Sequence, residues 1–238
     1  MIQTLSIIIP VYNEQQTIAK LLNKITSLRL INNTKKQIIV IDDYSTDSSK
    51  NEIVLFIKNH PQENIIFHAH EENQGKGGSI ISGLKYVSGE YIIIQDADLE
   101  LNPEEINLLL VPIFEKQATV VYGSRFLKKE KREKEMILNR FANKFFTWLS
   151  NVILNVALTD MQTCYKLIPT RVIKSINLVE KRFAFDPEIT AKLAKNKQVK
   201  FAEVPISYTP RNHEEGKKIR WVDGFNQIFS ILKYGLFK

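Results

Sequence analysis

The chain has 238 residues, 44% of them apolar and 25% charged, and a formal net charge of +7. This length excludes more than one large domain or two small ones, and the composition is ordinary for a globular protein. Cys164 is the single cysteine, which excludes an internal disulfide framework and fits a reducing compartment. Because no Pro/Gly/Ser-rich linker divides the chain, we expect one domain over residues 1–210. Residues 211–238 form a C-terminal extension of it.

Five apolar runs predict strands, and helical stretches separate them. The expected strands are Leu5–Val11, Gln37–Ile41, Ile65–Phe67, Tyr91–Ile94 and Thr119–Tyr122. The expected helices run from Asn13 to about Leu28, from about Asp47 to Asn59, from Gly75 to near Val87, and onward from Pro103. Strands that alternate with helices predict an α/β fold with a mainly parallel sheet and right-handed crossovers.

No segment predicts membrane insertion through a signal peptide or a spanning helix. Ile2–Val11 is short and has no basic start. Phe145–Leu158, the most apolar window, is shorter than the roughly 20 residues that a span requires. We therefore expect a cytoplasmic protein that meets a membrane only at its surface.

Two carboxylates follow the fourth apolar run. Asp96 and Asp98 stand at the C-terminal tip of Tyr91–Ile94, the edge where open α/β sheets bind ligands. Residues two apart on an extended chain point the same way, so both carboxylates can reach one ion. Hard oxygen ligands suit Mg²⁺ or Mn²⁺, the usual partners of a diphosphate. The alternative is a turn, in which Asp is common.

Basic residues form two clusters. Lys128–Lys134 mixes both charges and is typical of a solvated surface. Residues 211–220 contain Arg211, Lys217, Lys218 and Arg220, a set suited to phosphate-bearing or lipid partners. The aromatic residues form no exposed stacking pattern with these clusters, and no nucleic-acid-binding motif is present. We therefore expect no nucleic-acid partner.

Nine ordered motifs carry a family resemblance that covers nearly the whole chain. They are SIIIPVYNE (6–14), IIVIDDYSTD (38–47), NQGKGGSI (73–80), IIIQDADLE (92–100), YGSRF (122–126), DMQTCYKL (160–167), RFAFDPEI (182–189), VPISYTPR (204–211) and EEGKKIRW (214–221). This series resembles the inverting glycosyltransferases of family 2, and most of all the dolichyl- or polyprenyl-phosphate mannosyl- and glucosyltransferases. The resemblance implies a GT-A fold, a UDP- or GDP-linked sugar donor, and Mg²⁺ or Mn²⁺.

The resemblance also implies roles for individual residues. Those implied for the nucleotide sugar are Pro10, Tyr12, Glu14, Asp43, Lys76 and Asp96, and those implied for the metal are Asp96, Asp98 and Glu100. Alternatives remain for three of them: Asp43 as a turn cap, Lys76 as a solvated lysine, and Glu100 as a helix-start carboxylate. Gly75–Gly78 further resembles an anion-binding loop at a helix start.

A second set of residues is implied for the acceptor and the chemistry. The acceptor phosphate is assigned to Arg125, Lys166, Arg211, Lys217 and Lys218, and catalysis to Asp96, Asp98, Arg125 and Asp186. Asp160 and Gln162 belong to the same acceptor motif. Asp186 or Glu188 would orient the acceptor or act as a base, although a lipid phosphate needs little deprotonation. Cys164 lacks the partners of a cysteine nucleophile.

Three other features have simple interpretations. His68 and His70 are two zinc-type ligands without a third, which favours a structural role. Aromatic residues between Phe141 and Val156 indicate helix packing. A C-terminal stripe predicts an amphipathic helix that lies in a membrane interface or packs on the domain or a second copy, namely Val222, Phe225, Phe229, Leu232 and Leu236.

The sequence thus predicts a metal-dependent inverting glycosyltransferase that moves one sugar to polyprenyl or dolichyl phosphate at the cytosolic membrane face. A second hypothesis keeps the donor and makes the acceptor a glycan or glycolipid hydroxyl. A third is an inactive lipid- or nucleic-acid-binding module, against which the intact pair Asp96 and Asp98 argues.

Overall fold

The computed structural model describes residues 2–128, 137–182, 184–211 and 221–237, without the side chains of 137–139 and 221–225. Lys217 and Lys218, predicted for the acceptor phosphate, lie outside the described residues, as does most of the basic cluster between 211 and 220.

Seven strands form one sheet in the order β3-β2-β1-β4-β6-β5-β7. Their bounds are β1 Thr4–Val11, β2 Lys35–Asp42, β3 Ile65–Ala69, β4 Tyr91–Ile94, β5 Val120–Ser124, β6 Lys166–Pro169 and β7 Phe201–Pro205. β6 runs antiparallel to β4 and β5, and the other pairs are parallel. The predicted mainly parallel α/β sheet is therefore confirmed.

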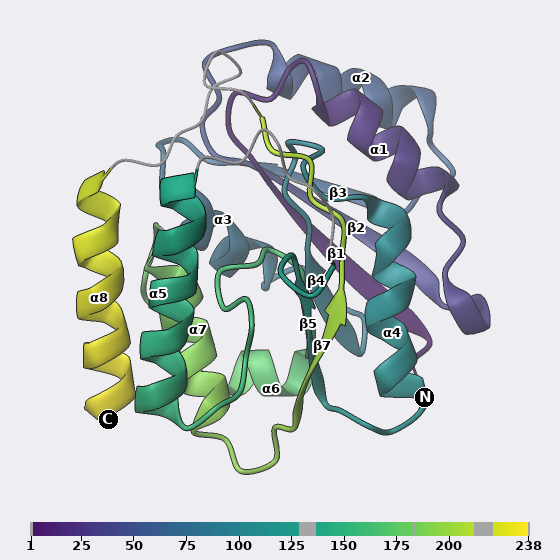
Figure 1. The fold of residues 1–238 in the computed structure, drawn as a ribbon. Helices are drawn as coiled ribbons and strands as arrows, with labels where there is room; N and C mark the ends of the chain where they lie inside the picture. The colour runs from purple at the N-terminus through teal and green to yellow at the C-terminus, as the bar shows by residue number, and fades with distance from the viewer. Residues whose placement is uncertain (1, 129–136, 183, 212–220, 238) are drawn as a thin grey trace.

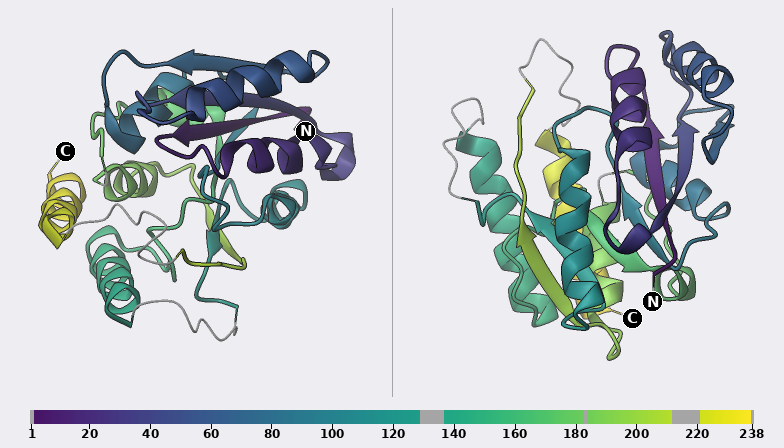
Figure 2. Two further views of the ribbon diagram at one scale, coloured as in Figure 1. Left: turned by 90° about the horizontal axis from the view of Figure 1, so that it is seen from above. Right: turned by 90° about the vertical axis from the view of Figure 1, so that its right-hand side faces the viewer.

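Helices cover both faces of this sheet (Figures 1 and 2). They are α1 Ile18–Ser27, α2 Ser49–Asn59, α3 Gly75–Gly83, α4 Ile106–Phe114, α5 Ile137–Leu154, α6 Thr170–Ser175, α7 Phe185–Ala194 and α8 Trp221–Leu236, with short 3₁₀ turns η1 Ile31–Asn33 and η2 Pro103–Glu105. α1 and α4 lie together on one face, joined where the Asn107 amide donates to the Arg29 carbonyl at 3.0 Å. α3 packs against β1 and β2, and α5, α7 and α8 form a group of three helices. Within the described ranges, no helix combines the length and apolar character needed to cross a membrane.

The apolar runs form the core as expected. Ile7–Ile9, Ile38–Ile41 and Ile92–Ile94 are buried, because β1, β2 and β4 are neighbours inside the sheet and helices cover them. Burial on both faces fixes the strand register, so the residues just after each strand gather at one edge. Asp42, Asp43 and Asp96 therefore share the C-terminal edge of the sheet.

The structure differs from the expected elements in three respects. The first helix begins at Ile18 rather than at Asn13, because Asn13 has a φ of 55° and its side-chain oxygen accepts the Thr46 N–H at 2.8 Å. The third helix ends at Gly83, short of Val87. The short antiparallel strand β6 was not predicted at all.

Candidate active site

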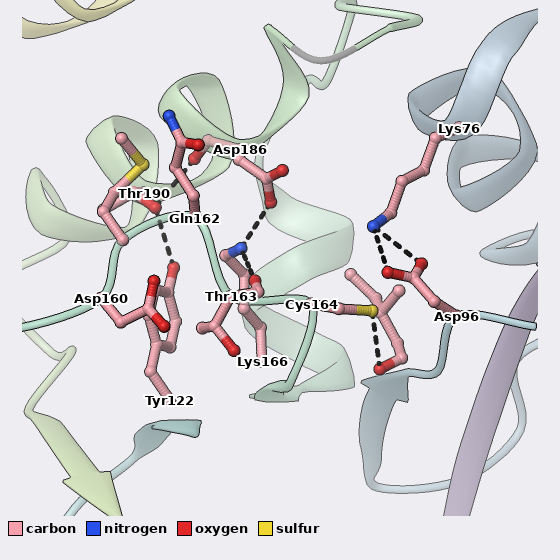
Figure 3. A network of polar contacts seen from close by, with 12 residues as sticks. Lys76, Asp96, Tyr122, Asp160, Gln162, Thr163, Cys164, Lys166, Asp186 and Thr190 are labelled. Carbon is pink, nitrogen blue, oxygen red and sulfur yellow. Dashed lines mark hydrogen bonds and ion pairs between the residues drawn. The ribbon is translucent and has the colours of Figure 1, made fainter. Parts of the chain in front are cut away.

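An ion pair lies at the tip of β4. The Lys76 ammonium lies 2.7 and 2.8 Å from the two carboxylate oxygens of Asp96 (Figure 3). Burial opposes the charge of Lys76, but Asp96 outweighs it and raises the Lys76 pKa well above its usual value. Burial likewise opposes the charge of Asp96, and Lys76 reverses this and lowers the Asp96 pKa. Both groups are therefore charged at neutral pH, and two residues predicted for the donor are in contact.

Asp98 stands in a different electrostatic environment. Burial, together with the charges of Asp96 and Glu100, raises the pKa of Asp98 to about 7. Its Oδ1 accepts the Glu100 N–H at 3.0 Å, which tightens the turn after β4. Among the described residues, no three His, Cys, Asp or Glu side chains form a metal-binding group, so Asp96, Asp98 and Glu100 do not converge as three ligands.

The segment that follows β7 crosses over this turn. Glu100 accepts the Arg211 N–H at 2.9 Å, and its carbonyl accepts the Thr209 N–H at 2.9 Å. The Arg211 guanidinium donates to the Asp98 carbonyl at 3.1 Å and to Glu14 Oε2 at 2.6 Å. Glu14, predicted for the donor, and Arg211, predicted for the acceptor, are therefore paired. Arg211 connects the end of β7 with the segment after β1.

Asp43 organises the start of α3. Its carboxylate accepts the N–H groups of Gln74 and Gly75 at 2.8 and 2.7 Å and lies 2.8 Å from His70 Nδ1. His70 Nε2 in turn lies 2.9 Å from Ser82 Oγ. Asp43 thus has the structural role that remained open for it, and its contact with a nucleotide stays a prediction. The pair of histidines is not a shared ligand set, since His70 bonds Asp43 and Ser82.

The glycines of α3 serve close packing, and the anion-binding role that the sequence suggested for Gly75–Gly78 stays a prediction. Gly75 has a φ of +81°, and a Cβ there would lie 2.5 Å from the Lys181 carbonyl oxygen. At Gly77 a Cβ would lie 2.2 Å from the Glu180 carbonyl oxygen. Gly78 donates its N–H to the Lys181 carbonyl at 3.0 Å. The backbone of residues 180–181 therefore fills the space in which side chains on these glycines would stand.

A second ion pair lies beyond β5. Asp160 is fully buried and grips Arg125 through two bonds, Nε–Oδ2 at 2.7 Å and Nη2–Oδ1 at 2.9 Å. The Glu203 carboxylate accepts the Thr159 and Asp160 N–H groups at 2.7 and 3.0 Å, which holds the acceptor motif against β7. Burial raises the Glu203 pKa. Arg125 is thus fixed in orientation by the predicted acceptor-side residue Asp160.

A third ion pair is about as deeply buried as the second. The Lys166 ammonium is fully enclosed and donates to Asp186 and to the Thr163 carbonyl (Figure 3). It also lies 5.2 Å from the ring centroid of Tyr122. The contact of Lys166 with an acceptor phosphate stays a prediction, and its described contacts are to the protein. Asp186, predicted as catalytic, faces Lys166 and is mostly buried.

The remaining predicted residues take simple positions. Pro10 and Tyr12 flank the end of β1 and are partly exposed. Cys164 is buried and donates to the Ile94 carbonyl at 3.4 Å, and burial beside Asp96 raises its pKa well above the usual value. A protonated thiol is a poor nucleophile, in agreement with the sequence. Gln162 donates from the acceptor motif to Gln227 of α8.

Two further residues support the site: His70, for which the sequence indicated a structural role, and Glu203, which the sequence did not single out. Each is polar, buried or half-buried, and bonded to a predicted residue or its motif. An open pocket of about 520 Å³ lies at His70. It is lined by His68, Ala69, His70, Glu71, Glu72 and Gln74. His70 directly follows β3, a position that many loop residues share, and Glu203 lies inside β7, a strand that the sequence did not predict.

Comparison with curated proteins finds sugar transferases. A relative of Yersinia pestis (strain Pestoides F), an undecaprenyl-phosphate 4-deoxy-4-formamido-L-arabinose transferase, is 35% identical over 150 residues, 60% of this chain and 45% of that protein. A transferase of the same name from Edwardsiella ictaluri (strain 93-146) is 26% identical over 216 residues, 91% of this chain and 63% of that protein. The chain therefore spans less than two thirds of the length of either relative.

Comparison with solved structures shows the fold. The glucosyl-3-phosphoglycerate synthase of Mycobacterium tuberculosis, in complex with Mn²⁺, UDP-glucose and phosphoglyceric acid, has a TM-score of 0.73 at 14% identity, covering 99% of this chain and 81% of that one. The mannosyl-3-phosphoglycerate synthase of Rubrobacter xylanophilus has a TM-score of 0.73 at 16% identity, covering 98% and 72%. The predicted GT-A fold is confirmed.

The family follows from a match to the sequence itself. The model of the family described as Glycosyl transferase family 2 matches residues 6–176, well over half of the 238 residues. The matched span contains β1 to β6 together with Asp96, Asp98, Arg125 and Lys166. The chain belongs to glycosyl transferase family 2.

Proposed function

We propose that this chain transfers one sugar, with inversion, from a nucleoside diphosphate sugar to a polyprenyl phosphate at the cytosolic membrane face. The observation that carries the proposal is the acidic tip of β4, where Asp96 is paired with Lys76 and Asp98 lies beside it. Two relatives named as undecaprenyl-phosphate sugar transferases support the lipid acceptor.

The residues at this tip fit a divalent metal. Asp96 and Asp98 would hold Mg²⁺ or Mn²⁺, which bind carboxylate oxygens and need few protein ligands when a diphosphate supplies others. Burial and two neighbouring carboxylates disfavour the charge of Asp98, and a cation would favour it. When bound, the metal would stabilise the negative charge that builds on the departing diphosphate.

Lys76 and Asp43 would act on the donor side. Lys76 keeps its positive charge beside Asp96, where charge on a diphosphate needs compensation. Asp43 fixes the start of α3 through the Gln74 and Gly75 N–H groups, and so fixes the position of Lys76. Positioning of this kind lowers the barrier, because the groups are already oriented before the reaction.

The acceptor needs positioning more than deprotonation. A lipid phosphate is anionic near neutral pH, so its oxygen is already nucleophilic. Arg125 and Arg211 carry guanidinium groups that can bind a phosphate through two parallel hydrogen bonds. Asp186, held by Lys166, would then orient the acceptor rather than remove a proton from it.

The test is transfer by the purified chain from a panel of nucleotide sugars to polyprenyl phosphate, with Mg²⁺ or Mn²⁺. We expect a lipid-extractable sugar phosphate that mild acid cleaves. Asp98→Asn should lower turnover by about 100-fold or more, as losses of transition-state charge stabilisation do, while the protein stays folded. Chelator should abolish activity reversibly. Glu104→Gln, which removes an exposed carboxylate near the same turn, is the matched control and should leave activity unchanged.

Other outcomes separate the alternatives. Transfer to a glycan or glycolipid hydroxyl with none to polyprenyl phosphate would support the second hypothesis. Nucleotide binding without transfer to any acceptor would indicate an inactive module. Full activity of Asp98→Asn, or of the unaltered chain in excess chelator, would refute the metal assignment.

A further inference from the structure

α5 exposes a stripe of large apolar side chains. Phe141, Phe145, Trp148 and Val152 are between 47% and 70% exposed. They follow one another at steps of four, three and four residues, so they share one face of the helix. Thr147 and Ser150 lie on the opposite face and are buried. The packing role expected for the aromatic residues of α5 holds for Phe146, which packs against the core with Leu149 and Ile153. It is wrong for Phe141, Phe145 and Trp148, whose side chains are exposed.

α8 also exposes a row of large apolar side chains. Phe229, Leu232 and Leu236, members of the predicted stripe, are between 37% and 67% exposed. Its buried face instead carries Gln227, Ser230 and Ile231. Ser230 donates to the Ala184 carbonyl at 3.2 Å, which fixes that face toward the start of α7. The sequence left two roles open for this stripe, contact with a membrane or packing on the protein. Its described members, Phe229, Leu232 and Leu236, point away from the protein interior.

The helices that carry the two stripes pack against each other. Gly235 of α8 packs on Ile153 and Leu154 of α5, where a Cβ would lie 2.4 Å from Ile153 Cγ2. The exposed Val152 and Leu236 are direct chain neighbours of these contact residues. Both views of the ribbon show α5 and α8 side by side at the same end of the molecule (Figures 1 and 2). We call the seven exposed residues of the two stripes the α5–α8 apolar surface.

Two helices that pack together and each expose a row of large apolar side chains indicate a partner, because monomeric proteins rarely expose such side chains in groups. The charges beside these side chains indicate which partner. Residues 137–154 contain Arg140 and Lys144 and no acidic residue, and the whole chain carries +7. Lys233 on α8 is paired with Glu180 at 3.1 Å, so α5 carries the stronger positive charge. Two copies meeting here would bring like charges together, whereas anionic headgroups would neutralise them.

We propose that the α5–α8 apolar surface docks on an anionic lipid bilayer, with α5 and α8 lying together in the headgroup region. Phenylalanine, leucine and tryptophan side chains suit that depth, and the basic residues beside them meet the lipid phosphates. The proposal assigns to α5 at least half of a contact that the sequence placed on α8 alone. It concerns docking only, so it does not depend on which acceptor the site uses.

Docking would place the site near the lipid. Gln227 on the buried face of α8 accepts a hydrogen bond from Gln162 of the acceptor motif. The same acceptor motif continues through Lys166 into β6. A bilayer held against α5 and α8 would therefore lie beside the acceptor half of the site, on the side from which a lipid-linked phosphate would arrive.

The test is flotation of the full chain with vesicles of phosphatidylglycerol and phosphatidylcholine, and with phosphatidylcholine alone. We expect binding to the anionic vesicles that weakens at high salt. Trp148→Gln and Phe229→Gln should each lower the partition coefficient by about tenfold, since each removes a large apolar side chain from the interface. Leu55→Gln, an equally exposed apolar residue on α2, is the matched control and should bind as the unaltered chain does.

The variant on α5 decides the new part of the proposal. Normal vesicle binding by Trp148→Gln, with loss in Phe229→Gln, would overturn the role of α5. Light scattering of the same samples tests the other occupant. A dimer that Trp148→Gln converts to a monomer, with no vesicle binding by the unaltered chain, would assign the surface to a second copy. The test stands apart from transfer, because nucleotide binding by these variants should remain unchanged whether or not the proposed reaction is correct.

Discussion

The ion pair between Lys166 and Asp186 allows a quantitative test of the buried half of the site. Lys166→Met keeps most of the side-chain length and removes the charge. The variant leaves Asp186, whose side chain is only 14% exposed, without its cation, and leaves the Thr163 carbonyl without its donor. Removing one partner of a buried pair typically costs about 3–5 kcal/mol.

That magnitude is a large fraction of the stability of a domain, which is typically about 5–15 kcal/mol. At this chain length it corresponds to a fall of roughly 6–20 °C in Tm. Equilibrium unfolding in urea, followed by circular dichroism, measures the change. Lys233→Met is the control, because Lys233 pairs with Glu180 at 3.1 Å and the two side chains are 44% and 27% exposed. It should cost less than about 1 kcal/mol.

A double-mutant cycle then separates the pair from its surroundings. Lys166→Met combined with Asp186→Asn should cost less than the sum of the two single changes, with a coupling of about 1–3 kcal/mol. The reasoning is refuted if Lys166→Met costs no more than Lys233→Met. It is also refuted if the two single changes are additive, because that would mean the two groups do not interact in solution.

Two further predictions concern packing and pH. Gly77→Ala should cost about 1–3 kcal/mol, because the new Cβ meets the Glu180 backbone, and more than Gly78→Ala, where it meets only the Gln74 side chain; equal urea midpoints would contradict this. Burial raises the folded-state pKa of Glu203, so its contribution to stability is lost as pH rises from 4.5 through that pKa. Glu203→Gln should therefore gain stability relative to the unaltered chain between pH 4.5 and neutral, and a pH-independent difference would contradict it.

The sequence predicted β1 to β5 because their information is local, but it did not predict β7, which is parallel to β5. Runs such as Ile7–Ile9 and Ile92–Ile94 are apolar without alternation, which is the pattern of strands buried on both faces. β6 was missed because its own residues do not carry this pattern. It has four residues and begins with Lys166, whose burial depends on Asp186 twenty positions away. Its antiparallel direction depends on β4 and β5, not on its own residues.

The two helices of the apolar surface show the limit of periodicity. Phe141, Phe145 and Trp148 recur at helical spacing, and this predicts an apolar face without saying what that face meets. Thr147 of α5 and Gln227 of α8 are each bonded to the acceptor motif. Only these tertiary contacts show that the faces that carry Thr147 and Gln227 pack inward. The glycines of α3 are a similar case, because the backbone that needs the space is about a hundred residues away.

The charged residues of the site show which part of the chemistry the sequence could predict. Their identities were predicted, but their pairing was not, because each pair joins distant segments: Lys76 with Asp96, Arg125 with Asp160, Lys166 with Asp186, and Arg211 with Glu14. Each predicted phosphate-binding cation that the structure describes is therefore already bound to a carboxylate.

A substrate phosphate must consequently compete with a carboxylate for any of these cations. The competition is hardest at Lys166, whose ammonium is fully buried, and at Arg125, which Asp160 holds through two bonds from a fully buried position. Arg211 and Glu14 both remain partly exposed. Among the three described cations predicted for the acceptor phosphate, the exchange of a carboxylate for a phosphate is therefore least costly at Arg211, where water can stabilise Glu14 once it is released. We therefore predict that the acceptor phosphate enters where the chain after β7 crosses the tip of β4, next to the carboxylates that would hold the metal.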